Sequence, residues 1–584
     1  MAFERAEIFP ESDLPDPSEL IEHGRRLAKD VSLGTCAFLQ EHAVASELEY
    51  KRRCVSQGRV MFQAQVGYRD IVKTERVCLE IDAHLRARGY RVDRYGLIFD
   101  RSMGYPSQVR AQRPHGTGLL VHDPERLKAL TARVPVAPHF GDHMIGPPAS
   151  VENTIMALEA GSTSLGNLAQ YYTFDLLYEG SDLPRTEATI KAIALVAALP
   201  VEVIVHSNVD DGFASLFTDL CCSIGIVLVE QHIVGGLLGA TLAHSFGQTF
   251  PNPFHRIAFQ RALGRVEPQA GTMIYGDTTE FSAEPWSNVA ALSTSLTADL
   301  LAQRLSPTLH AIMPVPLTEF SRIPEAEEII TAHEAANGLN ARIESLLPLV
   351  EVSAADVMAD RLVDGGRRFA KALFDGFEQA GIDTDNAVEM LLAIKRLGPR
   401  RLEKLFGPGE IRPGRARRKA VVASNTIVEI EAKTDTLVNS LSKEVRSALE
   451  TKALVACVGT TDVHEWGKLG LERAFEQLGV AVVDAGVNAD PEQVVRCALE
   501  QGADFIALST YNGIALTYAR ALRKAMSVAQ LELPVYVGGR LNQVPEGSNT
   551  SLPVDVTEKL REEGCNPCTD VEEMLHHLAD ANTG

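Results

Sequence analysis

The sequence has no surplus of basic residues. Its 584 residues include 56 Lys and Arg against 77 Asp and Glu, for a formal net charge of −21. Phosphate binding requires clustered cations, so we expect neither nucleic acid nor an anionic membrane surface as a partner. The nearest basic run is RPGRARRK, Arg412–Lys419, and its Pro and Gly content indicates a solvated linker.

Long hydrophobic runs and a cysteine framework are also lacking. No apolar run approaches the ~20 residues of a membrane-spanning helix, and the opening MAFERAEIFPESDLPDP is polar, unlike a signal peptide. Nine cysteines in a chain of this length do not form a disulfide scaffold. The pair Cys565 and Cys568 has no second CxxC beside it, which argues against zinc. We therefore expect a cytoplasmic protein without a membrane partner.

From about residue 70 to residue 350, short apolar runs alternate with helix-like runs, as in βα units around a parallel sheet. Six of these runs end in polar residues: VPVAPHFGDHM, STSLGNLAQYY, VEVIVHSNVDD, IVLVEQH, GTMIYGDTTE and LHAIMPVPLTE. A (β/α)8 barrel places its active site at the carboxyl ends of its strands. We therefore predict a TIM-type barrel with a polar mouth, although each strand end alone could be an ordinary cap or turn.

The mouth residues predicted to contact a small-molecule substrate include His139, Asp142, His143, His206, Asp210, Tyr275 and Asp277. The clearest domain boundary is FGPGEIRPGRARRK, Phe406–Lys419, which is rich in Gly, Pro and Arg. We predict a helical N-terminal arm over 1–65, the barrel with C-terminal helices over 66–405, a linker over 406–450 and a second domain over 451–584.

The second domain repeats the βα pattern in compact form. Its apolar runs ALVACVG, VAVVDAG, FIALST and PVYVGG are each followed by a helix-like run. This order predicts a doubly wound, flavodoxin-like (Rossmann-like) sheet, in which ligands lie off the carboxyl ends of the strands. Three motifs fall at those ends: Asp462-x-His464-x-x-Gly467, Ser509-Thr510 and Gly538-Gly539.

The first motif could be a helix cap with a chance histidine, but its spacing also suits a metal site. A neutral imidazole is a ligand for cobalt, iron, zinc or copper. Asp462 can accept the other ring N–H of His464 and fix its tautomer. Because the motif has one histidine, a zinc ion held by protein alone is not expected. The metal should arrive within a macrocycle, and the paired glycines leave a slot for a flat ring or a nucleotide tail.

The pattern DxHxxG, then a serine, then GG, resembles the cobalamin-binding domain shared by cobalamin-dependent mutases and methionine synthase. The resemblance implies that His464 replaces the dimethylbenzimidazole tail as lower axial ligand to cobalt, with Asp462 as its partner. It also implies a tail pocket lined by Gly467, Ser509, Thr510, Gly538 and Gly539. Tyr511 stands where this family usually has a leucine.

The chain also resembles glutamate (methylaspartate) mutase, with both subunits fused. The barrel-subunit likeness lies in GPPASVENTIMALEAGSTSLGNL, EFSRIP and LFGPGE, and the small-subunit likeness in STYNGI and VYVGGRLNQVPEG. It implies adenosylcobalamin, an isomerase working by radical 1,2-rearrangement, and a homodimer. Arg101 can fill one place of that family's arginine clamp, but His139 and His206 fall near the others. Glu319 matches an acidic residue near the adenosyl group. We therefore expect a small carboxylic or amino acid substrate other than free glutamate.

Three other functions remain in view. A methylcobalamin-dependent corrinoid methyltransferase usually has a four-helix cap before the cobalamin domain, and the segment 411–451 is too short and basic for one. A cobalamin-binding regulator or carrier would not need a polar barrel mouth. An aminomutase that also uses pyridoxal phosphate would need a Schiff-base lysine, and Lys468 is interpreted as a surface residue.

Overall fold

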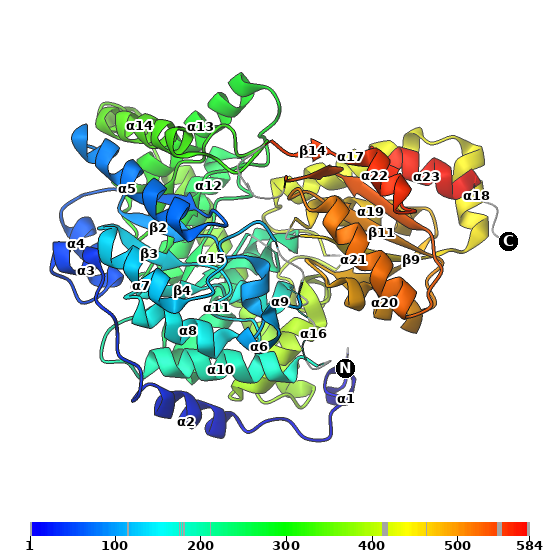
Figure 1. Ribbon diagram of the computed structural model, residues 1–584, viewed down its shortest axis with the longest axis horizontal. Coiled ribbons are helices and arrows are strands. Elements are labelled where there is room, and N and C mark those ends of the chain that lie inside the picture. The colour runs from blue at the N-terminus through cyan, green and yellow to red at the C-terminus, as the bar shows by residue number, and fades with distance from the viewer. Residues whose placement is uncertain are drawn as a thin grey trace. The chain divides into compact units, whose positions relative to one another are not determined.

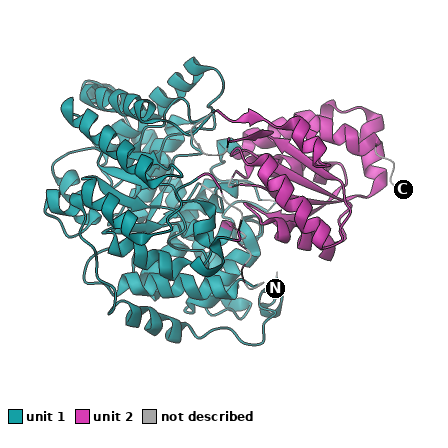
Figure 2. Ribbon diagram, in the orientation of Figure 1, with its two compact units in different colours: residues 1–111, 118–172, 181–426 teal, residues 112–117, 173–180, 427–584 magenta. Residues whose placement is uncertain are grey.

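The computed structural model describes residues 3–113, 116–174, 176, 178, 181–210, 212–411, 418–462, 464–545 and 552–580. The chain forms two compact units (Figure 2). Unit 1 comprises residues 1–111, 118–172 and 181–426, and unit 2 comprises residues 112–117, 173–180 and 427–584. Most of the predicted basic linker, 412–417, lies outside the described residues.

Unit 1 is a barrel of eight parallel strands, which confirms the predicted (β/α)8 fold (Figure 1). The strands are β1 (Met61–Val66), β2 (Arg94–Leu97), β3 (Ala137–Phe140), β4 (Ser164–Gly166), β5 (Ile204–Asn208), β6 (Thr241–Ser245), β7 (Met273–Tyr275) and β8 (Ala311–Met313). Their order is β6-β5-β4-β3-β2-β1-β8-β7. A parallel bridge between Phe246 and Ile274 joins β6 to β7 and closes the ring.

A helix follows each strand and packs on the outside of the barrel. These helices are α5 (Ile71–Ala87), α7 (Pro124–Arg133), α8 (Ser150–Glu159), α10 (Leu183–Ala197), α11 (Leu220–Gln231), α12 (Pro253–Val266), α13 (Pro285–Leu305) and α14 (Ala326–Ile343). Several begin at a side-chain cap, as Asp70, Asp123 and Asn252 accept backbone N–H groups of the first turn. Short elements at the strand ends are η1 (Arg101–Gly104), α6 (Ser107–Arg110), α9 (Ala169–Thr173), η2 (Ala214–Leu216) and η3 (His232–Leu237).

The helices at the two ends of unit 1 complete the barrel. The C-terminal ones are η4 (Leu347–Leu349), α15 (Ser353–Gln379) and α16 (Ala387–Phe406), and α15 packs on α11 and α12. The N-terminal ones are α1 (Arg5–Ile8), α2 (Pro17–Leu27), α3 (Ala37–His42) and α4 (Glu47–Ser56). Lys51 of α4 donates to the carbonyls of Thr272 (2.7 Å) and Leu309 (3.0 Å), ahead of β7 and β8. The segment 1–65 thus contains the helix α4, which closes the end of the barrel opposite its mouth, and most of β1.

One predicted strand is wrong. The run IVLVEQH forms the end of helix α11 and the first residue of η3, and the strand at this place in the barrel is β6, which the sequence did not indicate. Almost every residue of α11 is buried, from Leu220 to Glu230. A uniformly apolar run of this kind has no periodicity that distinguishes a buried helix from a buried strand.

Unit 2 is a five-stranded parallel sheet in the order β10-β9-β11-β12-β15, the flavodoxin-like order. The strands are β9 (Val455–Thr460), β10 (Ala481–Gly486), β11 (Phe505–Thr510), β12 (Val535–Gly539) and β15 (Asn566–Cys568), and a small antiparallel pair is β13 (Asn542–Gln543) with β14 (Val554–Asp555). The helices are α17 (Asn425–Ser440), α18 (Lys443–Lys452), α19 (Trp466–Gln477), α20 (Pro491–Glu500), α21 (Ala515–Val528), α22 (Thr557–Glu562) and α23 (Val571–Asp580). The CxxC pair borders β15, where both thiols are buried.

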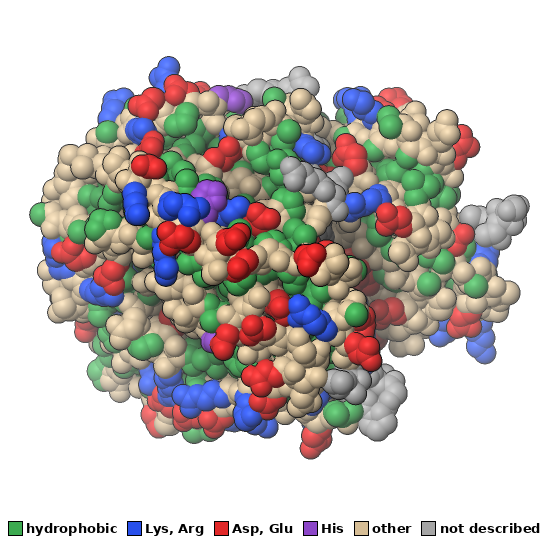
Figure 3. Space-filling model, turned by 90° about the horizontal axis from the view of Figure 1, so that it is seen from below, with side chains coloured by type: hydrophobic (Ala, Val, Ile, Leu, Met, Phe, Trp, Pro, Cys, Tyr) green, Lys and Arg blue, Asp and Glu red, His purple; other side chains and the backbone are tan. Residues whose placement is uncertain are grey.

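The stretch Leu220–Leu237 has the length and apolar composition of a membrane span, but 67% of it is buried in the protein, as in the core helix of a soluble protein. On the face in Figure 3, Lys and Arg side chains lie among Asp and Glu side chains.

Candidate functional site

Three sequence motifs of unit 2 meet at the carboxyl edge of its sheet. Thr460, the last residue of β9, pairs with Ser509 of β11, and Ser509 pairs with Gly538 of β12. Thr510 pairs with Gly539 in the same register. The strand order places β9 between β10 and β11, which is the switch point where flavodoxin-like folds bind ligands.

The Asp462 carboxylate is buried and holds the loop after β9 in place. Its Oδ1 accepts hydrogen bonds from Nδ1 of His464 (2.7 Å) and from the His464 backbone N–H (3.1 Å). Its Oδ2 accepts the backbone N–H groups of Tyr511 (2.7 Å) and Asn512 (3.0 Å). Burial alone would raise the pKa of this carboxyl, but the bonds from His464, Asn512 and Tyr511 hold the pKa below its usual value. Asp462 therefore carries a full negative charge at neutral pH.

The His464 imidazole is oriented for metal binding by this contact. Because Nδ1 donates its proton to Asp462, the neutral ring presents the lone pair of Nε2 as the ligand atom. The ring packs against Tyr511, with centroids 4.3 Å apart and planes inclined by 33°. The Arg540 guanidinium lies 4.0 Å from the Tyr511 centroid. Sequence reasoning did not assign these two neighbours a role, although Tyr511 was the residue that departed from the family pattern.

At two of the predicted glycines a Cβ would make a close approach. A Cβ on Gly467, in the first turn of α19, would stand 2.3 Å from Oγ of Ser509. Gly539 has a φ of +98°, and a Cβ there would stand 2.3 Å from the Thr510 carbonyl oxygen. At Gly538 the nearest atom to a Cβ would be 3.7 Å away, an ordinary contact distance, so its glycine is not forced by packing.

These residues fit cobalamin, a cofactor whose cobalt ion arrives within its own macrocycle. Among the residues that the structure describes, no group of three or more His, Cys, Asp or Glu side chains could hold a bare metal ion. His464 with its Asp462 partner supplies one oriented nitrogen. The hydroxyls of Ser509 and Thr510 and the side-chain-free surface of Gly538 lie next to it in the sheet register, where a nucleotide tail would be held.

Lys468 is not the surface residue that the sequence suggested. It is buried, and its ammonium lies 2.6 Å from Glu472 and 2.8 Å from Asp484. Burial lowers the pKa of Lys468, but the two carboxylates outweigh it and raise the pKa above its usual value. A permanently protonated amine is a poor Schiff-base nucleophile, which weakens the pyridoxal phosphate alternative.

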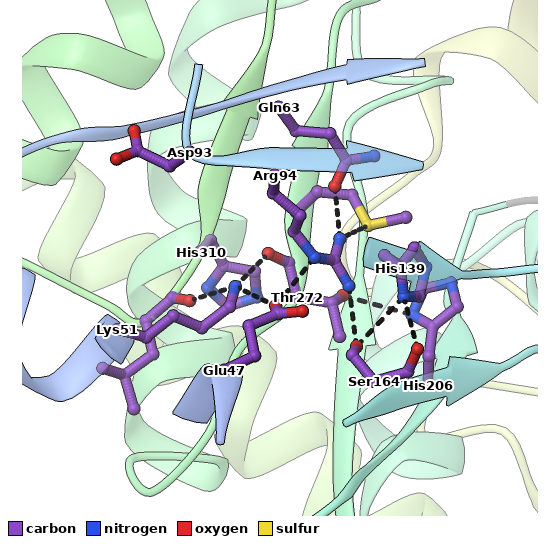
Figure 4. Close-up of polar contacts among 12 residues, drawn as sticks. Glu47, Lys51, Gln63, Asp93, Arg94, His139, Ser164, His206, Thr272 and His310 are labelled. Carbon is purple, nitrogen blue, oxygen red and sulfur yellow. Dashed lines mark hydrogen bonds and ion pairs between the residues drawn. The ribbon is translucent and has the colours of Figure 1, made fainter. Parts of the chain in front are cut away.

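The predicted barrel residues His139 and His206 lie side by side inside the barrel (Figure 4). They are 0% and 1% exposed, and their ring centroids are 5.0 Å apart. His139 Nδ1 lies 3.1 Å from the Ser164 carbonyl oxygen, and His206 Nδ1 lies 3.2 Å from Oγ1 of Thr272. Burial, reinforced by the nearby Arg94 charge, lowers the pKa of both histidines well below the usual range. Both imidazoles are therefore neutral.

Arg94, the first residue of β2, was not predicted as part of this cluster. Its Nε lies 2.7 Å from Glu47 of α4, and its Nη2 donates to Oγ of Ser164 (2.8 Å) (Figure 4). Lys51 lies 3.4 Å from the same Glu47 carboxylate. Little in the sequence indicated this cluster, because Glu47 and Lys51 belong to the segment interpreted as an accessory arm, far from Arg94 in the sequence.

The other predicted mouth residues follow the carboxyl ends of their strands. Asp142 accepts from Gln170 Nε2 (2.8 Å), and Asp210 accepts the backbone N–H of Gly247 (2.8 Å). These two carboxylates therefore hold loops. The remaining residues are His143, buried with a φ of +61°; Tyr275, at the end of β7; Arg101, partly exposed in η1; and Glu319, exposed in the turn after β8.

Asp277, two residues after β7, differs from these loop-holding carboxylates. Its Oδ1 accepts the Thr279 hydroxyl (2.7 Å), while its buried Oδ2 has no hydrogen-bond partner among the described residues. Burial raises the pKa of Asp277 to about 6.

Comparison with known proteins places a B12 binding domain at residues 451–556. The glutamate mutase sigma subunit of Clostridium cochlearium is 35% identical over 94 residues, which are 16% of this chain and 69% of that protein. Glutamate mutase sigma subunit 2 of Haloarcula marismortui is 33% identical over 81 residues, 14% of this chain and 55% of that protein. The crystal structure of a novel cobalamin-binding protein from Desulfitobacterium hafniense DCB-2 aligns at 20% identity over 26% of this chain and 68% of that chain, with a TM-score of 0.19.

Proposed function

Because the chain belongs, through its B12 binding domain, to the family of the glutamate mutase sigma subunits, we propose that it is an adenosylcobalamin-dependent radical mutase. Its reaction is a 1,2-rearrangement of a small carboxylic or amino acid. The observation that carries this proposal is the pairing, in one chain, of an Asp462–His464 ligand site with a closed barrel that has a polar interior.

In this proposal the residues of unit 2 hold the cofactor. His464 Nε2 would bind the cobalt, with Asp462 fixing the ring. The pocket for the nucleotide tail would be lined by Gly467, Ser509, Thr510, Gly538 and Gly539. When bound, adenosylcobalamin supplies an organic radical that can remove a hydrogen atom from the substrate.

The barrel of unit 1 would bind and orient the substrate and exclude water from it. By the resemblance to glutamate mutase, His139 and His206 fall near two places of its arginine clamp, and both are neutral here. Two neutral imidazoles cannot supply the charge of two guanidinium groups to a second carboxylate. Free glutamate is therefore not the substrate that this interior favours. Arg101 and Glu319, after β2 and β8, remain candidates for substrate and adenosyl contacts.

The cobalt ligand is tested by electron paramagnetic resonance of the cobalt(II) protein. In wild type we expect coupling to one imidazole nitrogen, and His464→Ala should abolish it. His576→Ala is a matched control, because His576 is a half-exposed histidine in α23 of the same unit. If the nitrogen coupling persists in His464→Ala, the ligand assignment is wrong.

The reaction class is tested with the same spectroscopy. The holoprotein is mixed with candidate acids and amino acids, and a coupled cobalt(II)–organic radical signal supports the mutase. Methyl transfer from methylcobalamin without any radical signal would instead identify a corrinoid methyltransferase. Among the described residues between α16 and β9, the helices are α17 and α18, which is fewer than the four-helix cap of that class. A homodimer is tested by light scattering of the purified chain.

A further inference from the structure

The barrel interior contains a buried hydrogen-bond acceptor that no described residue satisfies. Nδ1 of His139 lies 3.1 Å from the carbonyl oxygen of Ser164, which can only accept, so Nδ1 carries the ring proton. The Ser164 hydroxyl, 3.0 Å from the same nitrogen, already accepts from Arg94. In the neutral ring Nε2 is then an acceptor, and this buried atom has no hydrogen-bond partner in the described part of the chain.

This acceptor lies toward the carboxyl end of the barrel. Nε2 of His139 lies 2.7 Å from the place that a Cβ on Gly141 would take, just past the end of β3. At the end of β4, a Cβ on Gly166 would stand 2.6 Å from Cδ2 of His206. Glycines at both positions make room for the imidazoles themselves, which therefore lie at the end of the barrel where (β/α)8 enzymes bind substrate.

A second unsatisfied acceptor occurs at the same end of the barrel, after β7. The Oδ2 atom of Asp277 is buried and has no hydrogen-bond partner among the described residues, while Oδ1 is used by Thr279. A buried polar atom without a partner is costly, so an isolated one in a native fold calls for an explanation such as a ligand. The His139 and Asp277 atoms can only accept hydrogen bonds, so a ligand that satisfies them must donate.

The buried cations nearby already have carboxylate partners. Arg94 pairs with Glu47 at 2.7 Å, and Arg256 pairs with Asp299 at 2.6 Å. Lys51 lies 3.4 Å from Glu47. A carboxylate brought into the interior would meet paired cations and the lone pairs of His139 and Asp277, which repel it.

We propose that the part of the substrate held inside the barrel carries a hydrogen-bond donor, an amine, amide or hydroxyl, in place of a second carboxylate. His139 Nε2 and Asp277 Oδ2 accept from that group. This inference rests on the proposed function, and it narrows the substrate class to an amino acid or related acid with a donor at its far end.

The test is calorimetric titration of the full-length chain at pH 8, with and without adenosylcobalamin. The probes are L-glutamate, L-glutamine, L-homoserine and L-ornithine, whose far ends are a carboxylate, an amide, a hydroxyl and an amine. We expect at least one donor probe to bind tenfold or more tightly than L-glutamate. Equal or tighter binding of L-glutamate, or no binding of any donor probe, overturns the proposal.

Two variants then locate the contact. His139→Phe should weaken binding of the best donor probe at least tenfold. His333→Phe is its matched control, because His333 is also buried and its ring nitrogens have no hydrogen-bond partner among the described residues. It packs on Phe62 from α14, outside the barrel. Equal binding by wild type and a folded His139→Phe chain refutes the contact. If His139→Phe does not fold, the wild-type probe ranking decides. The titration measures binding and does not depend on turnover. A missing radical signal would therefore refute the mutase without changing the order in which the probes bind, so the two failures can be distinguished.

Discussion

Replacing Asp462 by asparagine tests how His464 is held. The carboxylate accepts donors on both oxygens: Nδ1 and the backbone N–H of His464 on Oδ1, and the backbone N–H groups of Tyr511 and Asn512 on Oδ2. An asparagine side chain has one oxygen, so in either orientation its NH2 group faces donors. Asp462→Asn therefore changes only the hydrogen bonding and the charge of the site.

The magnitude follows from the number of donors left without an acceptor. A buried donor without a partner costs roughly 1–3 kcal/mol, so we expect unit 2 to lose about 2 kcal/mol of unfolding free energy. Loss of a histidine ligand's carboxylate partner typically weakens metal binding about 10–100-fold, which corresponds to roughly 1.4–2.8 kcal/mol. Cobalamin affinity should therefore fall by that factor, while the imidazole-nitrogen coupling of the cobalt(II) protein persists at saturation.

The assays are a spectrophotometric titration with cobalamin and denaturant unfolding of the full chain. Asp504→Asn is the control, because Asp504 accepts the Val455 backbone N–H (2.7 Å) at the opposite edge of the same sheet. It should bind cobalamin like wild type. If Asp462→Asn binds cobalamin within threefold of wild type, the Asp462–His464 contact does not support the ligand and our reasoning fails.

Two further predictions concern stability. Gly467→Ala places a Cβ 2.3 Å from Oγ of Ser509, so it should lower the unfolding free energy by about 1–3 kcal/mol and weaken cobalamin binding. Gly470→Ala, on the same helix, is the control, because its Cβ would lie 3.6 Å from Thr434 and should not destabilise the chain. Equal changes in unfolding free energy for the two variants would contradict this prediction. Burial lowers the pKa of His244, but Glu267 and Glu230 outweigh it and raise the pKa to about 10. The protonated His244 therefore stabilises the folded chain by at most roughly 5 kcal/mol. This contribution is complete below pH 6.5 and is lost as the pH rises through 10. Unfolding of wild type and His244→Gln between pH 7 and 10.5 should converge with rising pH, and parallel curves would refute it.

Local patterns in the sequence account for much of the barrel. The strands β3, β5, β7 and β8 were predicted because apolar residues run directly into polar ones. The strand β6 was missed because its five residues, TLAHS, include a histidine that is buried between Glu230 and Glu267. Because a charged side chain takes one of the five positions, the strand has no apolar run that sequence reasoning could detect.

The contacts around Asp462 and His464 could be predicted from the sequence more completely than those of the barrel interior, for a physical reason. The Asp462–His464 hydrogen bond is a contact between residues two positions apart, so its geometry is encoded in a short motif. The contacts of Tyr511 with His464 and Arg540 depend on the meeting of separate loops, and no spacing rule reveals them. Arg94 and Glu47 likewise meet only because α4 closes the barrel end opposite its mouth.

In the proposed substrate site, the charges of the barrel interior explain why specificity would rest on hydrogen bonds. Glu47 compensates one of the two cations beside it, Arg94 and Lys51, so a positive potential remains around His139 and His206. That potential acts with burial to keep both imidazoles neutral, because a third positive charge would be repelled. A neutral histidine distinguishes ligands by the direction of a hydrogen bond, whereas an arginine clamp selects charge. In the proposed mutase, histidines in place of clamp arginines would therefore change what the barrel can recognise, while the Asp462–His464 pair of unit 2 would be unaffected.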